Sequence, residues 1–372
     1  MNVFEKRGND LRKLSVLILF GGISPEHEVS LRSAESVLNQ IDHDKYNIFP
    51  VGITKEGDWI LFGGRDYSML PAGTWQSYEG NRRATLSPVH GQGLLSFEND
   101  CVVRERIDVV FPVLHGAGGE DGAIQGLLEI AGLPYVGPHI AASAACMDKC
   151  MTKLVADKAG VRQAKWHLVT RAAYEHNADA VAHQVEQQFA YPVFVKPAGT
   201  GSSVGVSKVR SREELFQALE TALQYDRKVL VEEFIDGQEV ECAAIGNPET
   251  GVSVTRPGEI LAGAEFYTYD DKYKNGVSQV VIPAHLSDEK LDEVRDAAKA
   301  AYLALGCTGL ARCDFFVERG TGRVLCNELN TMPGFTAISM YPKLMEACRG
   351  LSFSALADKL IGLALGRRKG RY

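Results

Sequence analysis

The chain has 372 residues, of which 45% are hydrophobic and 23% are charged, and its formal net charge is −7. This composition is typical of a soluble globular protein with two or three domains, and the negative charge argues against nucleic-acid binding. The apolar run 14–20 is too short to span a membrane and no cleavage-site pattern follows it, so we expect a cytoplasmic protein without a membrane segment. The eight cysteines form no CxxC pair, and we expect them to be reduced.

The first third of the chain has the pattern of an α/β domain with a parallel sheet. Apolar runs at 14–20 and 47–54 predict buried strands, and the segment between them has a glycine turn followed by helical spacing. The segment 62–100 is rich in glycine, serine and polar residues, and we expect it to be irregular. A further strand is predicted at 107–116, before a helix with an acidic first turn. We place the first domain boundary at 137 and expect the substrate-binding domain at 1–137.

The rest of the chain mixes strands and helices, which predicts an α+β region. Helices are expected over 147–160, where Gly160 is the C-cap, from a capping box at Ser211, and over 287–305 and 351–365. Strands are predicted at 191–197, 204–209, 228–234, 239–246, 312–318 and 323–329. We expect a central domain over 138–233 and a C-terminal domain over 234–372.

The stretch KPAGTGSSVGVSKV, at 196–209, has the composition of a phosphate-binding loop. A strand pattern follows its glycines, so it is not a Walker A loop, which opens a helix. It is predicted to be a hairpin loop that offers successive backbone N–H groups and hydroxyls to phosphate, with Lys196 as a point charge. The alternative is a plain flexible hairpin.

A second candidate site lies on the hairpin predicted from 312 to 330. Residues two apart on a strand face the same way, so Arg312 and Asp314 share a face, as do Glu328 and Asn330. An all-oxygen set of two carboxylates and one amide suits Mg²⁺ bound together with nucleotide phosphates. The alternative, a solvated face with salt bridges, fits less well with the strongly apolar residues that flank the set.

Three loops contribute further candidates. Glu26 and His115 each follow a strand of the parallel sheet, at the edge where ligands bind in open α/β sheets. The aromatic and charged segment FYTYDDKY, at 266–273, could cover a site as a lid. The turn at Pro333-Gly334 could hold a carboxylate or an oxyanion with its free N–H groups. Each could also be an ordinary surface loop.

Together the motifs resemble one family. The stretches GGxSxEHEVSLxSA (21–34), HGxxGEDGxxQG (115–126), MDK (147–149), KPxxxGSSVGVxKV (196–209), GLARxDFF (309–316) and NELNTMPGFT (327–336) are similar to those of D-alanine–D-alanine ligases of the ATP-grasp fold. The resemblance runs from about residue 14 to 365. It implies a three-domain ATP-grasp fold in which ATP lies between the central and C-terminal domains.

The resemblance also implies roles for individual residues. Those implied to contact ATP are Lys149, Lys196, Ser202, Ser203, Glu232, Glu233, Ile235, Glu239, Lys272, Asn327 and Glu328. Those implied to hold two Mg²⁺ ions, or Mn²⁺ in their place, are Asp314, Glu328 and Asn330. Those implied to face the two D-alanine molecules are Glu26 and His115 for the first, and Arg312, Gly334, Ser339 and Met340 for the second. Ser202, Glu26 and Tyr273 resemble a hydrogen-bonded trio that closes the lid, and Lys272 resembles a lid lysine that reaches the transferred phosphate.

The implied activity is the ATP-dependent ligation of two D-alanines through a D-alanyl phosphate, for peptidoglycan precursor synthesis, by a homodimer. Whether K⁺ takes part stays open. A D-alanine–D-lactate or D-alanine–D-serine ligase is the near alternative, and Tyr273 after Lys272 favours D-alanine. A non-catalytic nucleotide-binding protein of the same fold should lack the full metal set. A nicotinamide-dependent dehydrogenase should have GxGxxG after the first strand, which this sequence does not have.

Overall fold

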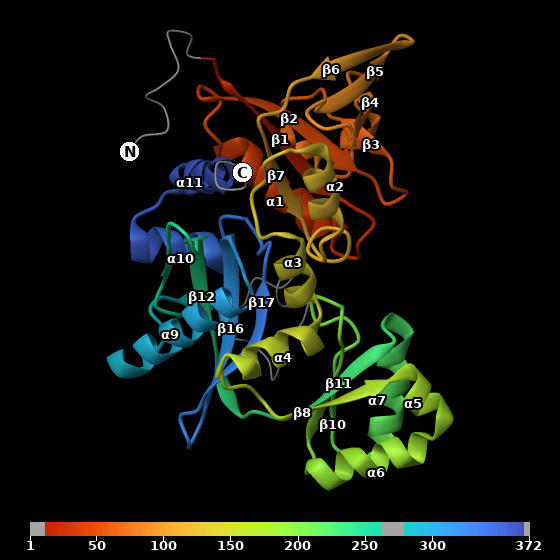
Figure 1. The fold of residues 1–372 in the computed structure, drawn as a ribbon, viewed down its shortest axis with the longest axis vertical. Helices are drawn as coiled ribbons and strands as arrows, with labels where there is room; N and C mark the ends of the chain where they lie inside the picture. The colour runs from red at the N-terminus through yellow and green to blue at the C-terminus, as the bar shows by residue number, and fades with distance from the viewer. Residues whose placement is uncertain (1–11, 262–278, 368–372) are drawn as a thin grey trace.

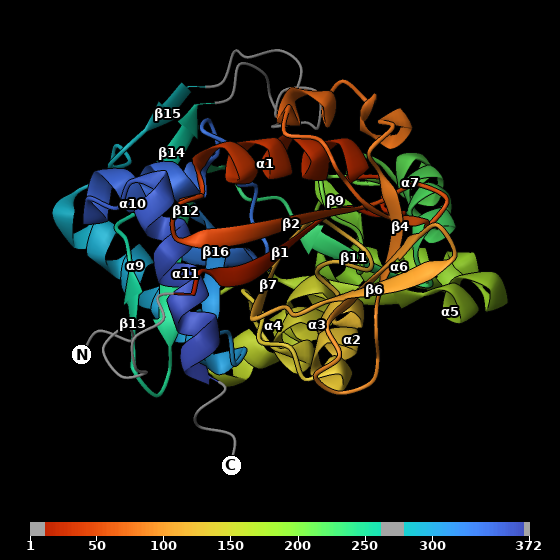
Figure 2. The same cartoon turned by 90° about the horizontal axis from the view of Figure 1, so that it is seen from above.

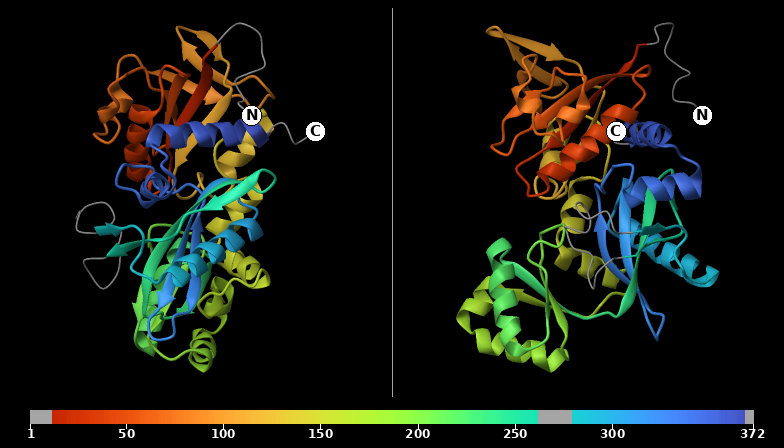
Figure 3. Two further views of the ribbon diagram at one scale, coloured as in Figure 1. Left: turned by 90° about the vertical axis from the view of Figure 1, so that its left-hand side faces the viewer. Right: turned by 180° about the vertical axis from the view of Figure 1, so that it is seen from behind.

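Three separate sheets organise the computed structural model, which describes residues 12–261 and 279–367. They form three lobes, with the N-terminal lobe at the top of Figure 1 and the other two below it. The two lower lobes are well separated when seen from behind, in the right-hand view of Figure 3.

The N-terminal sheet has seven strands in the order β6-β5-β4-β3-β2-β1-β7. Its elements are β1 (Leu14–Gly21), α1 (His27–Gln40), β2 (Tyr46–Ile53), β3 (Trp59–Leu61), η1 (Tyr67–Met69), η2 (Trp75–Ser77), β4 (Arg82–Leu86), β5 (Leu94–Glu98), β6 (Cys101–Glu105), β7 (Val109–Leu114) and α2 (Ala123–Ala131). The predicted parallel unit is confirmed, because β1 pairs in parallel with both β2 and β7. The prediction that 62–100 is irregular was wrong for 82–86 and 94–98, which form β4 and β5, whereas residues 62–81 form turns and the short 3₁₀ helices η1 and η2. Short antiparallel strands extend the sheet there, and their exposed faces give little apolar pattern to detect.

The central sheet is antiparallel, with the order β10-β9-β11-β8. The elements of this part of the chain are α3 (Ile140–Met147), α4 (Lys149–Lys158), β8 (Trp166–Thr170), α5 (Arg171–His176), α6 (Ala178–Gln188), β9 (Val193–Pro197), β10 (Ser207–Val209), α7 (Arg212–Tyr225) and β11 (Lys228–Glu233). Four of the helices, α4 to α7, begin at side-chain caps, where Asp148, Thr170, Asn177 and Ser211 accept from backbone N–H groups of the first turn.

The C-terminal sheet follows the order β15-β14-β12-β16-β17, and β13 pairs with β12. Its elements are β12 (Gly237–Asn247), β13 (Gly251–Val254), β14 (Gly258–Leu261), β15 (Gln279–Val281), α9 (Asp288–Ala304), β16 (Gly309–Glu318), β17 (Val324–Asn330), α10 (Met340–Arg349) and α11 (Phe353–Arg367). The predicted hairpin from 312 to 330 is confirmed as β16 and β17.

The core of the N-terminal lobe shows why β1 reads as an unbroken apolar run. Its side chains alternate between two faces, and both faces are buried. Val16, Ile18 and Phe20 pack in one cluster with apolar residues of α1, α10 and α11, whereas Leu17 and Leu19 pack with residues of α2. The last helix therefore returns to the first lobe, as the view from above in Figure 2 shows. This return packs the C-terminal region against one face of the N-terminal sheet.

Candidate active site

One cavity of about 560 Å³ collects candidate residues from all three lobes. The predicted site residues that line it are Glu26, His115, Lys149, Ser202, Arg312, Glu328, Asn330, Gly334, Ser339 and Met340. They come from loops at the ends of β1, β7 and β17, from α4, from the β9–β10 loop and from β16. Residues more than 300 positions apart, such as Glu26 and Met340, thus share one space, which is the arrangement expected of a substrate site.

Glu26 lies at the N-cap of α1 and contacts two glycine-containing loops. Its Oε1 accepts a hydrogen bond from the Ser202 hydroxyl. A Cβ atom at Gly116 would lie 2.4 Å from Glu26 Oε2, and one at Gly201 would lie 2.8 Å from it. Because these distances are below any real Cβ contact, only glycine fits at either position while Glu26 is in place. Tyr273, the third member of the trio expected from the sequence, lies outside the described residues.

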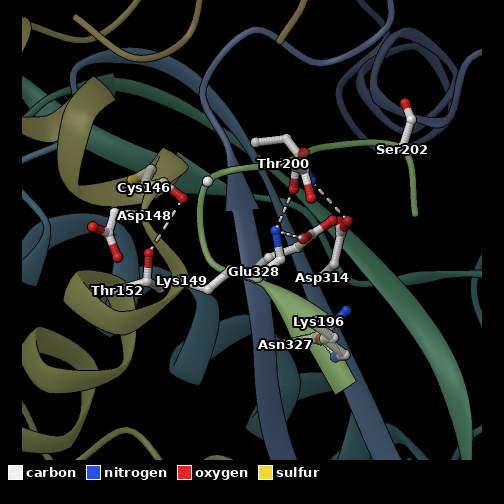
Figure 4. A network of polar contacts seen from close by, with 12 residues as sticks. Cys146, Asp148, Lys149, Thr152, Lys196, Thr200, Ser202, Asp314, Asn327 and Glu328 are labelled. Carbon is white, nitrogen blue, oxygen red and sulfur yellow. Dashed lines mark hydrogen bonds and ion pairs between the residues drawn. The ribbon is translucent and has the colours of Figure 1, made fainter. Parts of the chain in front are cut away.

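The phosphate loop connects β9 and β10, which pair as an antiparallel hairpin, as the sequence predicts. Ser202 and Ser203 both have positive φ, at 49° and 60°, so the loop turns through the left-handed region at these two residues. Lys149, at the start of α4, donates to the Thr200 carbonyl oxygen at 2.6 Å, and its Nζ lies 3.7 Å from Glu328 Oε2. Figure 4 shows this lysine between the loop and the β17 carboxylate.

A buried charged trio supports the base of the phosphate loop. Glu232, which is 4% exposed, receives Lys196 Nζ at 2.7 Å and Lys153 Nζ at 3.0 Å. Burial alone would raise the pKa of Glu232, but the two ammonium groups outweigh it and lower the pKa to about 2. Burial would lower the pKa of Lys196, but the Glu232 carboxylate raises it. Both Lys196 and Glu232 are therefore charged at neutral pH.

Lys153 was missed in the sequence. Its spacing of four from Lys149 places both lysines on one side of α4, and its position among apolar helix residues was the available signal.

The row of acidic residues across β12, β16 and β17 is the candidate metal site. Asp314 is in register with Glu328 on one side and with Glu241 on the other. Asn330 Nδ2 donates to Asp314 Oδ2 at 2.9 Å, so the face predicted from strand parity is formed. Glu241 was missed, although the same parity rule applied to 239–246 would have placed it on this face.

Arg312 forms a bidentate ion pair in the same row. Its Nε and Nη2 donate to the two oxygens of Asp314 at 2.8 and 2.7 Å, and its Nε lies 3.0 Å from Glu241 Oε2. Burial would lower the pKa of Arg312, but Asp314 and Glu241 raise it further above its ordinary value. A cation fixed between two carboxylates in the cavity wall can stabilise a developing negative charge.

His115 and Glu120 lie side by side in the loop after β7 and both line the cavity. His115 is 5% exposed, and burial lowers its pKa. Burial, followed by the nearby Glu26 carboxylate, raises the pKa of Glu120 to about 8, and Arg312 opposes this rise. Glu120 was missed in the sequence, because nothing in the motif HGAGGEDG distinguishes it from a solvated loop carboxylate.

Gly334 and Ser339 lie in the segment between β17 and α10. Ser339 Oγ accepts from the Thr336 N–H at 3.0 Å and lies 2.8 Å from the Thr336 hydroxyl, so it closes the turn. Within the described residues, no acceptor takes the Gly334 N–H. Met340 begins α10 and is 5% exposed.

The remaining nucleotide candidates lie at the junction of β11, β12 and β17. Glu233 Oε1 accepts from the Lys165 N–H at 2.8 Å, Ile235 is buried among apolar residues, and Glu239 is exposed on β12. Asn327 Oδ1 accepts from Lys196 at 3.3 Å. Lys272 lies outside the described residues.

Comparison with known proteins decides the family. The model named D-ala D-ala ligase N-terminus matches residues 15–138, and the one named D-ala D-ala ligase C-terminus matches residues 155–362. This chain belongs to the D-alanine–D-alanine ligase family. A D-alanine–D-alanine ligase of Caldicellulosiruptor bescii is 46% identical over 96% of the chain and 97% of its own length, and one of Acetivibrio thermocellus is 47% identical over 95% and 96%.

Solved structures of the family share its ATP-grasp fold. The VanG D-Ala:D-Ser ligase from Enterococcus faecalis superposes with a TM-score of 0.85 at 38% identity, over 95% of this chain and all of that one. The D-alanine–D-alanine ligase from Coxiella burnetii superposes with a TM-score of 0.82 at 34% identity, over 96% of each. The fold expected from the sequence motifs is thereby confirmed. In the described part of the chain, no helix is long and apolar enough to cross a membrane.

Proposed function

We propose that this chain joins two D-alanine molecules into D-alanyl-D-alanine, with ATP as the co-substrate and a D-alanyl phosphate as the intermediate. One observation carries the proposal: a single cavity holds a carboxylate, Glu26, an ammonium, Lys149, and an arginine, Arg312, next to the phosphate loop. Activation of a carboxylate by ATP needs charge compensation for phosphate and a separate place for the incoming amine.

The first D-alanine binds beside Glu26 and His115, where the Glu26 carboxylate faces its ammonium group. Its carboxylate then points towards the phosphate loop and attacks the γ-phosphorus of ATP, which forms D-alanyl phosphate and releases ADP as the bond between the β- and γ-phosphates breaks. The second D-alanine lies near Arg312, Ser339 and Met340, and its amine attacks the acyl carbon after losing a proton. The Arg312 guanidinium and the Gly334 N–H stabilise the oxyanion of the tetrahedral intermediate, and phosphate leaves.

Lys149, Lys196 and the loop residues Ser202 and Ser203 bind the ATP phosphates in this proposal. The segment with Glu232, Glu233, Ile235 and Glu239, together with Asn327 and Glu328, binds the rest of the nucleotide and its metal side. The Ser202–Glu26 hydrogen bond closes the phosphate loop onto the N-terminal lobe, because it joins residues 176 positions apart. Closure is chemically necessary, since water hydrolyses an acyl phosphate.

The donor set of Asp314, Glu328 and Asn330 fits Mg²⁺ or Mn²⁺. Both carboxylates and the amide lie on one sheet face next to Lys149, which also suits nucleotide phosphate. Asp314 gives both oxygens to Arg312, so an ion must displace part of that pair. Mg²⁺ would neutralise charge on the ATP phosphates. We propose that these three residues hold it.

A phosphate-release assay over a panel of D- and L-amino acids and D-hydroxy acids tests this function. Release that depends on D-alanine, with formation of the dipeptide, is expected. Release from ATP that is independent of D-alanine would refute ligation.

A D-alanine–D-serine or D-alanine–D-lactate ligase is the second candidate, since the VanG structure superposes closely. Competition between D-alanine, D-serine and D-lactate identifies the second substrate from the product formed. Running it between about pH 6 and pH 9 sets D-lactate apart from the two amino acids, because an amine must lose a proton before attack and a hydroxy acid carries no such amine. Predominant D-alanyl-D-lactate or D-alanyl-D-serine at neutral pH would overturn the choice of D-alanine.

We further propose a cytoplasmic homodimer that supplies the peptidoglycan precursor pathway, with domains at 1–137, 138–233 and 234–372. The cytoplasmic location is supported by the need for ATP and by the eight cysteines, which are all free thiols. Light scattering of the purified protein tests the dimer.

A further inference from the structure

The segment between β17 and α10 is held at two points by the N-terminal lobe. Met332 donates its N–H to Glu120 Oε1 at 3.0 Å, and its carbonyl oxygen lies 2.9 Å from His115 Nδ1. A carbonyl only accepts, so His115 Nδ1 carries the proton and donates. Both backbone groups of one residue are therefore bonded by side chains more than 200 positions away.

The second point of attachment uses the other nitrogen of the same histidine. With its proton on Nδ1, neutral His115 accepts at Nε2 from the Ser33 hydroxyl, which lies 3.0 Å away. Ser33 Oγ in turn accepts from the Phe335 N–H at 3.3 Å. Every donor and acceptor in this chain of bonds is matched only if His115 is neutral, which agrees with its lowered pKa.

Between the two points lie only Pro333 and Gly334. Proline has no N–H, and within the described residues no acceptor takes the Gly334 N–H. The two attachments therefore fix the direction of one free donor, which lines the cavity. Glu120 is itself anchored, because its other oxygen accepts from the Gly116 N–H at 2.9 Å.

We propose that Glu120 is a positioning residue for the second half of the reaction: by holding Met332 it sets where Gly334 presents its N–H to the acyl carbonyl and the incoming amine. The proposal rests on the proposed function, in which this N–H stabilises the oxyanion. Glu120 acts through Met332, so it serves attack by the second substrate and leaves formation of the acyl phosphate largely unaffected.

Hydroxylamine separates the two halves of the reaction. Hydroxylamine reacts with acyl phosphates without a catalyst, so in excess it traps the D-alanyl phosphate as D-alanine hydroxamate whether or not the Gly334 N–H is in place, and it does not fill a site for a second amino acid. With D-alanine, ATP, Mg²⁺ and hydroxylamine in one tube, the ratio of hydroxamate to dipeptide reports the second half alone. A variant that is merely less well folded loses both products equally and keeps the ratio.

Glu120→Gln should raise the ratio of hydroxamate to dipeptide by about 10- to 100-fold, because an amide has one acceptor oxygen where the carboxyl group of Glu120 accepts from two N–H groups, those of Met332 and Gly116. Asp121→Asn is the matched control. Asp121 also accepts from two backbone N–H groups, those of Gly118 and Ala123, but both lie within its own loop. Its ratio should stay within about twofold of wild type.

An unchanged ratio in Glu120→Gln, or an equal rise in both variants, would overturn the proposal. If circular dichroism shows that Glu120→Gln does not fold, Ser33→Ala tests the other attachment, where an unchanged ratio is equally decisive. A wild-type enzyme that makes neither product would refute the proposed function, which is a separate outcome.

Discussion

Replacing Lys153 by methionine removes one of the two ammonium groups that pair with the buried Glu232 carboxylate. The lowering of the Glu232 pKa from 4.5 to about 2 corresponds to about 3 kcal/mol of stabilisation from the whole environment. Lys196 is the nearer partner, at 2.7 Å against 3.0 Å, so Lys153 supplies somewhat less than half of the pairing. Methionine fills the same volume, and we expect Lys153→Met to cost about 1–2 kcal/mol.

The sign of the pH dependence follows from the lowered pKa. The stabilisation by Glu232 is complete above its unfolded pKa, near 4.5, and is lost as the pH falls through about 2. At pH 7 the full deficit of Lys153→Met is therefore measured. In the variant the pKa of Glu232 moves back towards 4.5, so the acid-induced loss of stability from this group should be smaller and should be complete at a higher pH than in wild type.

Calorimetry of the ligand-free protein at pH 7 measures the effect. The melting temperature of Lys153→Met should fall by roughly 2–5 °C. Lys158→Met, at an exposed position of the same helix, is the control and should change the melting temperature by less than about 1 °C. In the double variant with Glu232→Gln, the two losses should be less than additive. Equal melting temperatures for Lys153→Met and Lys158→Met would refute the pairing argument.

Three further substitutions probe the cavity. Gly116→Ala should lower the turnover number about 100-fold, because its Cβ would displace the Glu26 carboxylate. Gly118→Ala is the control, since Gly118 has a similar positive φ but open space around its Cβ, and this variant should stay close to wild type. Equal turnover numbers in the two variants would contradict the contact between position 116 and Glu26. Ser202→Ala should lower the turnover number about 10-fold without changing the melting temperature, and a wild-type rate would show that the hydroxyl does not serve closure. Glu328→Gln should raise the Mg²⁺ concentration for half-maximal activity at least about 10-fold, and an unchanged requirement would remove this carboxylate from the metal site.

The sequence predicted the features that depend on short-range periodicity. Side chains alternate along a strand, and the hairpin of β16 and β17 is joined by a short turn, so Asp314 and Glu328 could be placed together from their spacing alone. The phosphate loop was predicted for the same reason, because strand patterns on both sides of it exclude a helix. The strands at 82–105 were not predicted from the sequence. In β6, for example, most residues are exposed, so its side chains show no alternation of buried and exposed positions.

Long-range partners could not be predicted in this way. Glu120 and Lys153 resemble solvated surface residues until the chain is folded, because the partner of Lys153, Glu232, is 79 positions away and the partner of Glu120, Met332, is 212 positions away. For Lys153 the deciding fact is that Glu232 ends a buried strand beside α4, and for Glu120 it is that the β17–α10 segment crosses the loop after β7.

The two attachments of that segment explain why the last helix returns to the first lobe. The few hydrogen bonds between the N-terminal lobe and the segment 332–335 hold the Gly334 N–H in place only if the N-terminal and C-terminal lobes do not move apart. The apolar cluster shared by β1, α10 and α11 provides this restraint, because Phe335 packs within it against Phe111 and Tyr341. Packing on one side of Phe335 and hydrogen bonding on the other thus act on the same four-residue segment. The Gly334 N–H, which we propose as the oxyanion donor, is therefore positioned by the join between the N-terminal and C-terminal lobes, whereas the phosphate loop is attached to the N-terminal lobe through the hydrogen bond between Ser202 and Glu26.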